Sequence, residues 1–354
     1  MEYQVAVFIG RFQGFHNSHL QVLKQALSLA DELILVIGSA YCAPNIKNPF
    51  TFQERVEMIS ACLSPGELQK VHFVPVRDYY YNDLHWATDV QNAVNDKAEG
   101  KSIALIGGYK DSSSYYLKMF PQWDFIPAKF EQQLDATNVR KELYKIDNYV
   151  EMNGWTDKPQ PKLKLRASLY EVPYAVQKWL EDNFIGKEKH LKLIEENNFI
   201  EDYKAKWKDA PFPPTFVTAD AVVVQSGHVL LVKRKFSPGK GLWALPGGFI
   251  KQNERIENAA IRELKEETGI KINSLQLKNS VVESKVFDHP DRSLRGRTIT
   301  TAYYIKLPDG ELAEVKGSDD TDKAKWISLA DIGRMEDQFF DDHKHIINYF
   351  LNRG

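Results

Sequence analysis

The chain has 354 residues, with 46 Lys and Arg against 48 Asp and Glu, and this near-neutral balance provides no net field to attract nucleic acid or an anionic membrane. Its only cysteines, Cys42 and Cys62, belong to no cluster of Cys and His residues, which argues against a disulfide scaffold and a zinc site. The length favours two domains. No apolar run is long enough to span a membrane, and too few residues precede the first expected strand for a signal peptide. We therefore expect a cytoplasmic protein without nucleic-acid or membrane partners.

The start of the chain has the pattern of a phosphate-binding turn. Residues 5–9 are an apolar run that predicts a buried strand, and the periodicity of residues 20–29 predicts a helix. The sequence GRFQGFHNSH joins them, and a helix start that follows a glycine turn offers free N–H groups to phosphate. His16 and His19 are three residues apart there, so both imidazoles can donate to one anion. Either histidine alone would more often be a packed or capping residue.

This segment resembles the nucleotidyltransferase superfamily with its H-x-G-H signature. The resemblance is strongest to the archaeal-type nicotinamide mononucleotide (NMN) adenylyltransferases, whose sequence is close to GRFQPFHxGHL. Gly14 stands where that family has Pro, and Ser18 where it has Gly. The resemblance implies that His16 and His19 are catalytic and that the ATP contacts of the turn are Gly10, Arg11, Phe12 and Gln13.

Residues 31–39 predict a second strand, which completes a β-α-β unit of a parallel sheet. The following sequence IKNPFTFQER is, by itself, a helix start in which Thr51 is the N-cap and Glu54 completes a capping box. It also resembles the family segment NPFT-x-x-ER, which borders the mononucleotide. The resemblance implies that Lys47 and Asn48 contact NMN.

An aromatic loop, DYYYNDLHW, follows a third expected strand at residues 71–76. Aromatic loops usually pack against a core. In the family, an Asn and a Trp hold the nicotinamide, which implies Asn82 for hydrogen bonding and Trp86 for stacking, with one more residue between them than in the family. The residues themselves leave both interpretations open.

A second phosphate-binding segment follows the strands expected at residues 102–108 and 125–127. The sequence DATNVR begins a helix and resembles the superfamily motif S-x-T-x-x-R, whose Thr and Arg bind ATP phosphates. Thr137 and Arg140 match that motif, whereas Asp135 replaces the Ser. An acid is unfavourable beside phosphate unless it faces away or toward Mg²⁺. The alternative for Arg140 is a surface salt bridge.

The middle of the chain predicts a connection between two folds. Residues 155–165 are polar and contain proline, so we expect a loop there. Residues 187–207 are highly charged with an intermittent apolar face, which predicts a helical connector. The sequence PFPP then ends this helix. We therefore predict an adenylyltransferase domain at residues 1–185, a connector at 186–212 and a second domain at 213–354.

The second domain contains three acids on one helix face. After a hairpin signal around residues 226–227, residues 257–268 predict a helix that carries Glu263, Glu266 and Glu267 at i, i+3 and i+4. Three adjacent carboxylates repel one another unless a cation lies among them, and Mg²⁺ or Mn²⁺ would also bind a pyrophosphate and activate water. A lone cluster of this kind would more often be a solvated helix face.

The complete segment GFIKQNERIENAAIRELKEETGI, residues 248–270, matches the Nudix box at every spacing. Arg262 is placed to pair with Glu254 and orient the loop. The resemblance implies an α/β/α sandwich with a mixed sheet. It also implies that the metal site consists of Gly248, Glu263, Glu266 and Glu267.

A basic loop narrows the expected substrate. The sequence FDHPDRSLRGR resembles the F-x-x-P-x-R-D-P-R-G-R/H element of ADP-ribose pyrophosphatase-like Nudix proteins, with Ser-Leu in place of Asp-Pro. This implies that Arg295 and Arg297 bind ADP-ribose. A solvated basic loop is the alternative. Further along, Asp319, Asp320 or Asp322 could supply another acid or form a turn.

Taken whole, the chain resembles the bifunctional NMN adenylyltransferase/Nudix hydrolases, an α/β architecture with a Rossmann-like nucleotidyltransferase domain followed by a Nudix domain. The first implied reaction converts ATP and NMN to NAD and pyrophosphate, with His16, His19 and Arg140 as the catalytic residues. The second hydrolyses ADP-ribose to AMP and ribose 5-phosphate, with the three glutamates holding Mg²⁺ or Mn²⁺. A second domain that only senses ADP-ribose, or a first domain that adenylylates another acceptor such as phosphopantetheine, are the alternatives. The sequence leaves open the oligomeric state, the use of nicotinic acid mononucleotide, the general base and any coupling between sites.

Overall fold

The computed structural model describes residues 2–108, 116–130, 134–145, 169–316 and 324–351. The chain divides into two compact units, Met1–Asn197 and Asn198–Gly354, and the division falls inside the segment predicted as a connector. The loop predicted at residues 155–165 lies outside the described residues. Of the helices in the described part, none has the length and apolar character needed to cross a bilayer.

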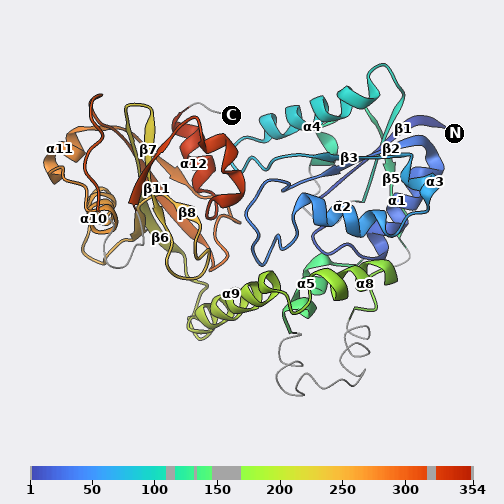
Figure 1. Ribbon diagram of the computed structural model, residues 1–354, viewed down its shortest axis with the longest axis horizontal. Coiled ribbons are helices and arrows are strands. Elements are labelled where there is room, and N and C mark those ends of the chain that lie inside the picture. The colour runs from blue at the N-terminus through green and yellow to red at the C-terminus, as the bar shows by residue number, and fades with distance from the viewer. Residues whose placement is uncertain (1, 109–115, 131–133, 146–168, 317–323, 352–354) are drawn as a thin grey trace. The chain divides into compact units, whose positions relative to one another are not determined.

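The first unit is built on a parallel sheet, as predicted (Figure 1). Its strands, in the order β3-β2-β1-β4-β5, are β1 (Tyr3–Gly10), β2 (Ala30–Ile37), β3 (Val71–Pro75), β4 (Ile103–Gly107) and β5 (Asp124–Pro127). All four neighbouring pairs are parallel. The order reverses between β1 and β4, and ligands of such sheets bind in the crevice at the carboxyl ends of the strands where the reversal occurs.

Helices cover both faces of this sheet. They are α1 (Asn17–Leu29), α2 (Phe52–Ser60), α3 (Pro65–Leu68), α4 (Asp83–Ala98), α5 (Ala136–Lys145), α8 (Tyr174–Asn183) and the first part of α9 (Glu188–Ala205). Alternate residues of β1 belong to two cores: Ala6 and Phe8 pack with α1, α2, α5 and α8, and Val5 and Val7 pack with α4. The uninterrupted apolar sequence of β1 follows from burial on both faces.

The second unit contains a mixed sheet between helices, which confirms the predicted sandwich. The main path runs β10-β11-β6-β7-β12, with β8 beside β7 and β9 beside β6. The strands are β6 (Phe216–Gln225), β7 (His228–Lys233), β8 (Trp243–Ala244), β9 (Gly247–Phe249), β10 (Val281–Phe287), β11 (Thr298–Lys306) and β12 (Ala324–Ser328). Among the strands that the structure describes in this unit, β11 and β6 pair in parallel and the other pairs are antiparallel. Ser226 and Gly227 both have positive φ, as the predicted hairpin turn requires.

The helices of this unit are α10 (Ile256–Thr268), α11 (Ser274–Asn279), α12 (His343–Phe350) and the 3₁₀ turns η2 (Ile332–Arg334) and η3 (Glu336–Gln338). Ile261 and Leu264 of α10 share a core with Tyr303 of β11. The next residue of β11, Tyr304, stacks on Phe350 of α12. Because successive strand residues point to opposite faces, α10 and α12 lie on opposite sides of the sheet.

Candidate active sites

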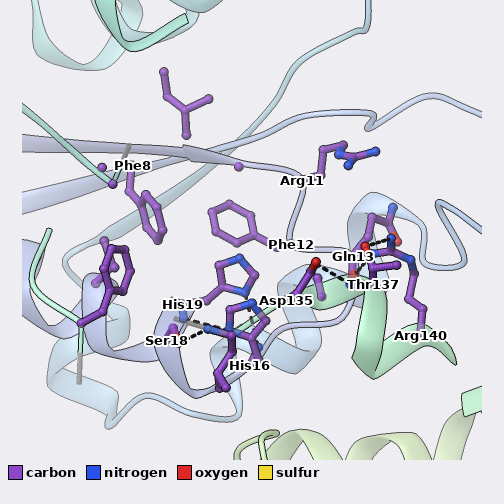
Figure 2. A pocket seen from close by; sticks show the side chains of 18 of the residues that line it. Phe8, Arg11, Phe12, Gln13, His16, Ser18, His19, Asp135, Thr137 and Arg140 are labelled. Carbon is purple, nitrogen blue, oxygen red and sulfur yellow. Dashed lines mark hydrogen bonds between the residues drawn. The ribbon is translucent and has the colours of Figure 1, made fainter. Parts of the chain in front are cut away.

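A cavity of about 250 Å³ lies at the carboxyl ends of β1 and β4, where the strand order reverses (Figure 2). Its lining includes the end of β1 and the turn after it with the start of α1, the glycines that end β4, and the loop that begins α5, together with Tyr116 and Phe130. All residues predicted to contact ATP or to act on its phosphates line this one cavity: Gly10, Arg11, Phe12, Gln13, His16, His19, Thr137 and Arg140.

The two histidines are held by each other's backbone. His16 is the N-cap of α1; its Nδ1 accepts from the backbone N–H of His19 at 3.3 Å, and Nδ1 of His19 accepts from the N–H of His16 at 3.4 Å. The rings stack with centroids 3.7 Å apart. Because both Nδ1 atoms accept, each neutral ring carries its proton on Nε2. His16 is only 4 % exposed, yet both histidines line the cavity side by side (Figure 2).

Phe12 supports this arrangement from behind. Its backbone is left-handed with φ +52°, and its ring packs edge-on against Phe8 and His19 at 5.1 and 5.2 Å. A Cβ at Gly10 would lie 2.7 Å from the Phe12 ring, so only glycine fits there. The predicted ATP contact Phe12 thus forms a wall that fixes His19.

The side chain of Gln13 is fully engaged within the protein. Its amide donates to the backbone carbonyl of Phe50 at 2.8 Å and accepts from the N–H of Phe50 at 2.9 Å. The turn after β1 is thereby joined to the NPFT segment. Gln13 lines the cavity, as predicted for an ATP contact, but its polar atoms hold the two loops together.

Arg140 is buried rather than part of a surface salt bridge. Its guanidinium donates to the carbonyl of Gln13 at 2.8 Å and to Oγ1 of Thr137 at 3.2 Å. Burial lowers its pKa, and the nearby Arg11 lowers it further. A cluster of buried or neighbouring guanidinium groups is stabilised by an anion, which fits a phosphate site.

Asp135, the departure from the superfamily motif, does face the cavity (Figure 2). Its Oδ1 accepts from the backbone N–H of Thr137 at 2.9 Å, so the carboxylate caps the start of α5. The acid therefore occupies one of the free N–H groups that the helix start could have offered to phosphate.

The residues predicted to bind NMN lie outside the lining of this cavity. Asn48 is buried, and within the described part of the chain its Oδ1 has no hydrogen-bond partner. A buried acceptor without a partner costs about 1–3 kcal/mol, so a ligand that donates to it would be favoured. Lys47, its neighbour, is partly buried.

Asn82 and Trp86 of the aromatic loop both have partners within the protein, as the packing interpretation expects, and their contact with nicotinamide stays a prediction. Asn82 caps α4, where its Oδ1 accepts from the N–H of His85 at 3.1 Å. Trp86 packs against Tyr116 and Phe120, with ring centroids 5.7 and 5.9 Å away. Tyr116 itself lines the cavity, so Trp86 stands directly behind the cavity wall.

In the second unit, two of the three predicted glutamates meet the backbone of β9. Glu267 accepts from the N–H of Gly247 at 3.0 Å. A Cβ at Gly248 would lie 2.8 Å from the carboxyl carbon of Glu263, so glycine is required where the acid approaches the strand. Glu266 lies at the exposed edge of the same helix face.

Arg262 balances these acids. It binds Glu254 with two hydrogen bonds of 2.8 and 2.9 Å, which confirms the predicted pairing, and it also reaches Glu263 at 2.5 Å and Glu266 at 3.0 Å. The guanidinium lowers the pKa of Glu254 to about 2. The guanidinium of Arg262 therefore holds the loop through Glu254 and two box glutamates, Glu263 and Glu266.

The pKa values of the inner acids are shifted the other way. Burial raises the pKa of Glu267 to about 8, and the nearby Glu263 and Asp220 raise it further. Burial also raises the pKa of Glu263. Across the described residues, no three acidic, His or Cys side chains form a ready metal-binding group. The carboxylates of Glu263 and Glu267 are nevertheless hard oxygen donors that fit a divalent cation such as Mg²⁺ or Mn²⁺. Such a cation would stabilise the ionised form that burial disfavours.

Comparison with known proteins covers both units. A cytidylyltransferase-like family model matches residues 7–108, and a NUDIX domain model matches residues 214–350. The chain is similar, over 99 % of both chains, to a bifunctional NMN adenylyltransferase/ADP ribose pyrophosphatase from Francisella tularensis, solved in complex with AMP and a Mn ion, with a TM-score of 0.85 and 38 % identity. The chain belongs to this bifunctional family.

Separate relatives match each half of this bifunctional chain. A nicotinamide/nicotinic acid mononucleotide adenylyltransferase of Acinetobacter baylyi is 43 % identical over 145 residues, which are 40 % of this chain and 77 % of that protein. An ADP-ribose pyrophosphatase of Methanocaldococcus jannaschii is 33 % identical over 169 residues, 47 % of this chain and 88 % of that protein.

One departure from the adenylyltransferase motif has a structural reason. Gly14 has φ +94°, which proline cannot adopt. The turn of this family member therefore differs in backbone path from one with Pro at that position. Ser18, the second departure, accepts a hydrogen bond from the N–H of Leu134 at 3.3 Å and so links α1 to the loop before α5.

Arg55 is the main residue of the adenylyltransferase unit whose role the sequence did not reveal. It is 0 % exposed, and its guanidinium donates to four backbone carbonyls at 2.6–3.1 Å. These carbonyls belong to Arg11, Gly38, Ser39 and Thr51. Burial lowers the pKa of Arg55 to about 10. Its position in NPFT-x-x-ER was the only signal.

In the Nudix unit, Asp220 is a residue whose role the sequence likewise did not reveal. It is buried in β6, accepts from Oγ1 of Thr300 at 2.5 Å, and raises the pKa of Glu267. A Cβ at Gly247 would lie 2.1 Å from its Oδ1, which explains the first glycine of the Gly-Gly pair. A lone acid in an otherwise apolar strand was the available signal.

The three arginines of the basic loop have different contacts. Arg292 is buried and binds Asp342 through two hydrogen bonds of 2.9 and 3.0 Å. Arg295 lies over the ring of Phe249, 5.3 Å from its centroid, and its buried Nε has no partner within the described residues. Arg297 donates to the carbonyl of Asp288 at 2.5 Å. Asp319, Asp320 and Asp322 lie outside the described residues.

Proposed function

We propose that the chain carries out two reactions of NAD metabolism. The first unit transfers AMP from ATP to NMN, giving NAD and pyrophosphate, and the second hydrolyses ADP-ribose to AMP and ribose 5-phosphate with Mg²⁺ or Mn²⁺. The observation that carries this proposal is an intact Nudix box together with both histidines of the nucleotidyltransferase motif, in a chain that matches a bifunctional enzyme over 99 % of its length. We assign the reactions to residues 1–185 and 213–354, with 186–212 as the connector.

The first reaction needs positioning and charge neutralisation rather than a base, because the phosphate of NMN is already a nucleophile. The Nε2–H groups of His16 and His19 are proposed to donate to the ATP phosphates as charge develops. Arg140, already held by the carbonyl of Gln13, would contribute a fixed positive charge. Asn48, with its unsatisfied Oδ1, supports a donor-bearing ligand such as the NMN amide or ribose beside Lys47.

In the second reaction, Glu263, Glu266 and Glu267 with the backbone of Gly248 would hold the divalent cation. When bound, the cation supplies an activated water and neutralises the pyrophosphate. Arg262 keeps the carboxylates oriented. Arg295 is placed beside Phe249, directly after the box glycine, and its unpaired Nε supports an anionic ligand there.

The partners that we propose are therefore the small molecules ATP, NMN, NAD and ADP-ribose. The unpaired thiols of Cys42 and Cys62 agree with a cytoplasmic location. An assay of the full chain with ATP and a panel of phosphate acceptors, and separately with ADP-ribose and Mg²⁺ or Mn²⁺, tests both reactions. Transfer to phosphopantetheine but not to NMN, or binding of ADP-ribose without release of AMP, would reject the corresponding half.

A further inference from the structure

One edge of the Nudix sheet is an exposed strand. Among the strands that the structure describes, β10 pairs with β11 alone, and residues 282–286 are all exposed. An edge strand presents unpaired N–H and C=O groups that can pair with another strand. Val282 and Val286 are 62 % and 52 % exposed, unusually open positions for branched apolar side chains.

A β-bulge, one of the features that protect sheet edges, is present only at the start of β10. A register shift lies between Val281 and Glu283, and the pairing with β11 is regular from Glu283 to Phe287. A bulge disturbs pairing locally, so it leaves the centre of β10 available. The exposed residues contain no proline that would prevent pairing.

The exposed sequence, Val-Glu-Ser-Lys-Val, is complementary to itself when two copies run antiparallel. With a two-fold axis at Ser284, Glu283 lies opposite Lys285 of the partner subunit on both sides of the axis. Opposite charges directly across two antiparallel strands are favourable. Val282, the bulge residue without a Cα partner in β11, comes level with Val286 of the partner subunit.

Only the register centred on Ser284 places Glu283 opposite Lys285. Residues opposite each other in an antiparallel pair point to the same face, so the two-fold axis must pass through a residue and not between two residues. An axis at Glu283 would put two glutamates opposite each other, and an axis at Lys285 two lysines, and like charges in that position are unfavourable. Glu283 and Lys285 lie on the same face of the sheet, where the ammonium of Lys285 is 5.4 Å from the ring centroid of Tyr349 in α12.

We propose that β10 is the contact through which two copies of this chain form a two-fold dimer, with their Nudix sheets joined edge to edge. The contact is isologous and closes on itself, so it yields a dimer rather than a filament. Pairing of about five residues gives an interface well below the roughly 1,600 Å² of a standard stable complex, so the dimer should dissociate on dilution.

The test is sedimentation velocity of the full chain over a range of concentrations, with charge variants of β10. Glu283→Lys and Lys285→Glu each place like charges opposite one another twice in the dimer, and each should raise the dissociation constant by at least about tenfold. An equimolar mixture of the two single variants restores opposite charges at every position, as does the double variant. Both should dimerise like the original chain.

Because both side chains are exposed and belong to neither proposed site, NAD synthesis and ADP-ribose hydrolysis should be unchanged in all variants, which controls for folding. The proposal is overturned if the original chain sediments as a monomer at every concentration. It is equally overturned if the single variants dimerise as strongly as the original chain, or if mixing them fails to restore association.

Discussion

The two proposed sites handle phosphate by opposite electrostatic means. In the adenylyltransferase unit, neutral imidazoles are locked by reciprocal bonds to each other's backbone, and a buried arginine is held by carbonyl and hydroxyl oxygens. In the Nudix unit, acids crowd against two glycines and a single arginine balances them. The first site is organised to donate directly to an anion, whereas the second has an excess of negative charge that a divalent cation would complete.

The largest effect is expected from removing the carboxylate of Glu267 in the Nudix site. Glu267→Gln keeps the shape of the side chain but removes the charge beside Gly247, so AMP release from ADP-ribose should fall by on the order of 10²–10³-fold or more. NAD synthesis by the same protein is the internal control and should be unchanged. A parallel fall in both activities would contradict independent sites.

The matching change in the first unit should have a similar or slightly smaller effect. His19→Ala removes one Nε2–H donor and one half of the reciprocal pair, so NAD synthesis should fall by on the order of 10²-fold while ADP-ribose hydrolysis persists. His72→Ala, at a partly exposed histidine of β3 beside Glu32, is the control and should retain both activities. Full NAD synthesis in His19→Ala would remove the basis for a donor role.

A smaller effect is expected from Arg55→Lys. The ammonium group cannot span carbonyls from three loops, so the free energy of unfolding of this unit should fall by about 2–4 kcal/mol and kcat for NAD synthesis by about tenfold. Chemical denaturation and steady-state kinetics measure the two effects. An unchanged kcat would show that Arg55 stabilises the loops without setting the geometry of the site.

A pH effect should appear in the metal-free Nudix unit. The pKa of Glu267 is raised to about 8 in the folded protein, so between about pH 4.5 and pH 8 the folded state holds a proton that the unfolded state has lost. In the presence of a chelator, the free energy of unfolding of this unit should therefore decrease as pH rises through that range. Glu267→Gln should reduce the slope, and so should saturating Mn²⁺, while the raised pKa of Glu263 keeps part of it in the metal-free variant. A slope as steep in the variant as in the original chain would assign it to other groups.

The smallest effect is expected in substrate affinity. Arg295→Lys loses the planar group over Phe249, so KM for ADP-ribose should rise by about tenfold with a smaller change in kcat. Arg297→Lys is the comparison, because that side chain is engaged with Asp288. If the two variants behave alike, the different surroundings of these arginines have no functional meaning.

Local sequence patterns predicted the elements that are locally determined. The buried strand before the first turn, the capping box at Thr51, the hairpin at Ser226-Gly227 and the pairing of Arg262 with Glu254 depend on residues close in the chain, and the structure confirms each of them. The eight residues predicted to contact ATP or its phosphates also lie around one cavity, because the two motifs that contain them meet where the sheet reverses its order.

Interactions between distant residues could not be predicted in the same way. Arg55 reaches a carbonyl 44 residues away, Thr300 donates to an acid 80 residues away, and Arg292 pairs with an acid 50 residues away. Nothing in their immediate neighbours identifies these partners, since only the folded arrangement brings them together. The same reason explains why Gln13 was expected to contact only ATP, whereas its amide binds the backbone of Phe50.

A crystal structure of the full chain with a non-hydrolysable ATP analogue and Mn²⁺ would show both modes of phosphate binding, with anomalous scattering to locate the metal. We predict phosphate oxygens within hydrogen-bond distance of Nε2 of both His16 and His19, and a manganese peak among Glu263, Glu266 and Glu267. Phosphates bound elsewhere with the imidazoles turned away, or manganese absent from the three glutamates, would contradict the division between direct and metal-mediated phosphate binding.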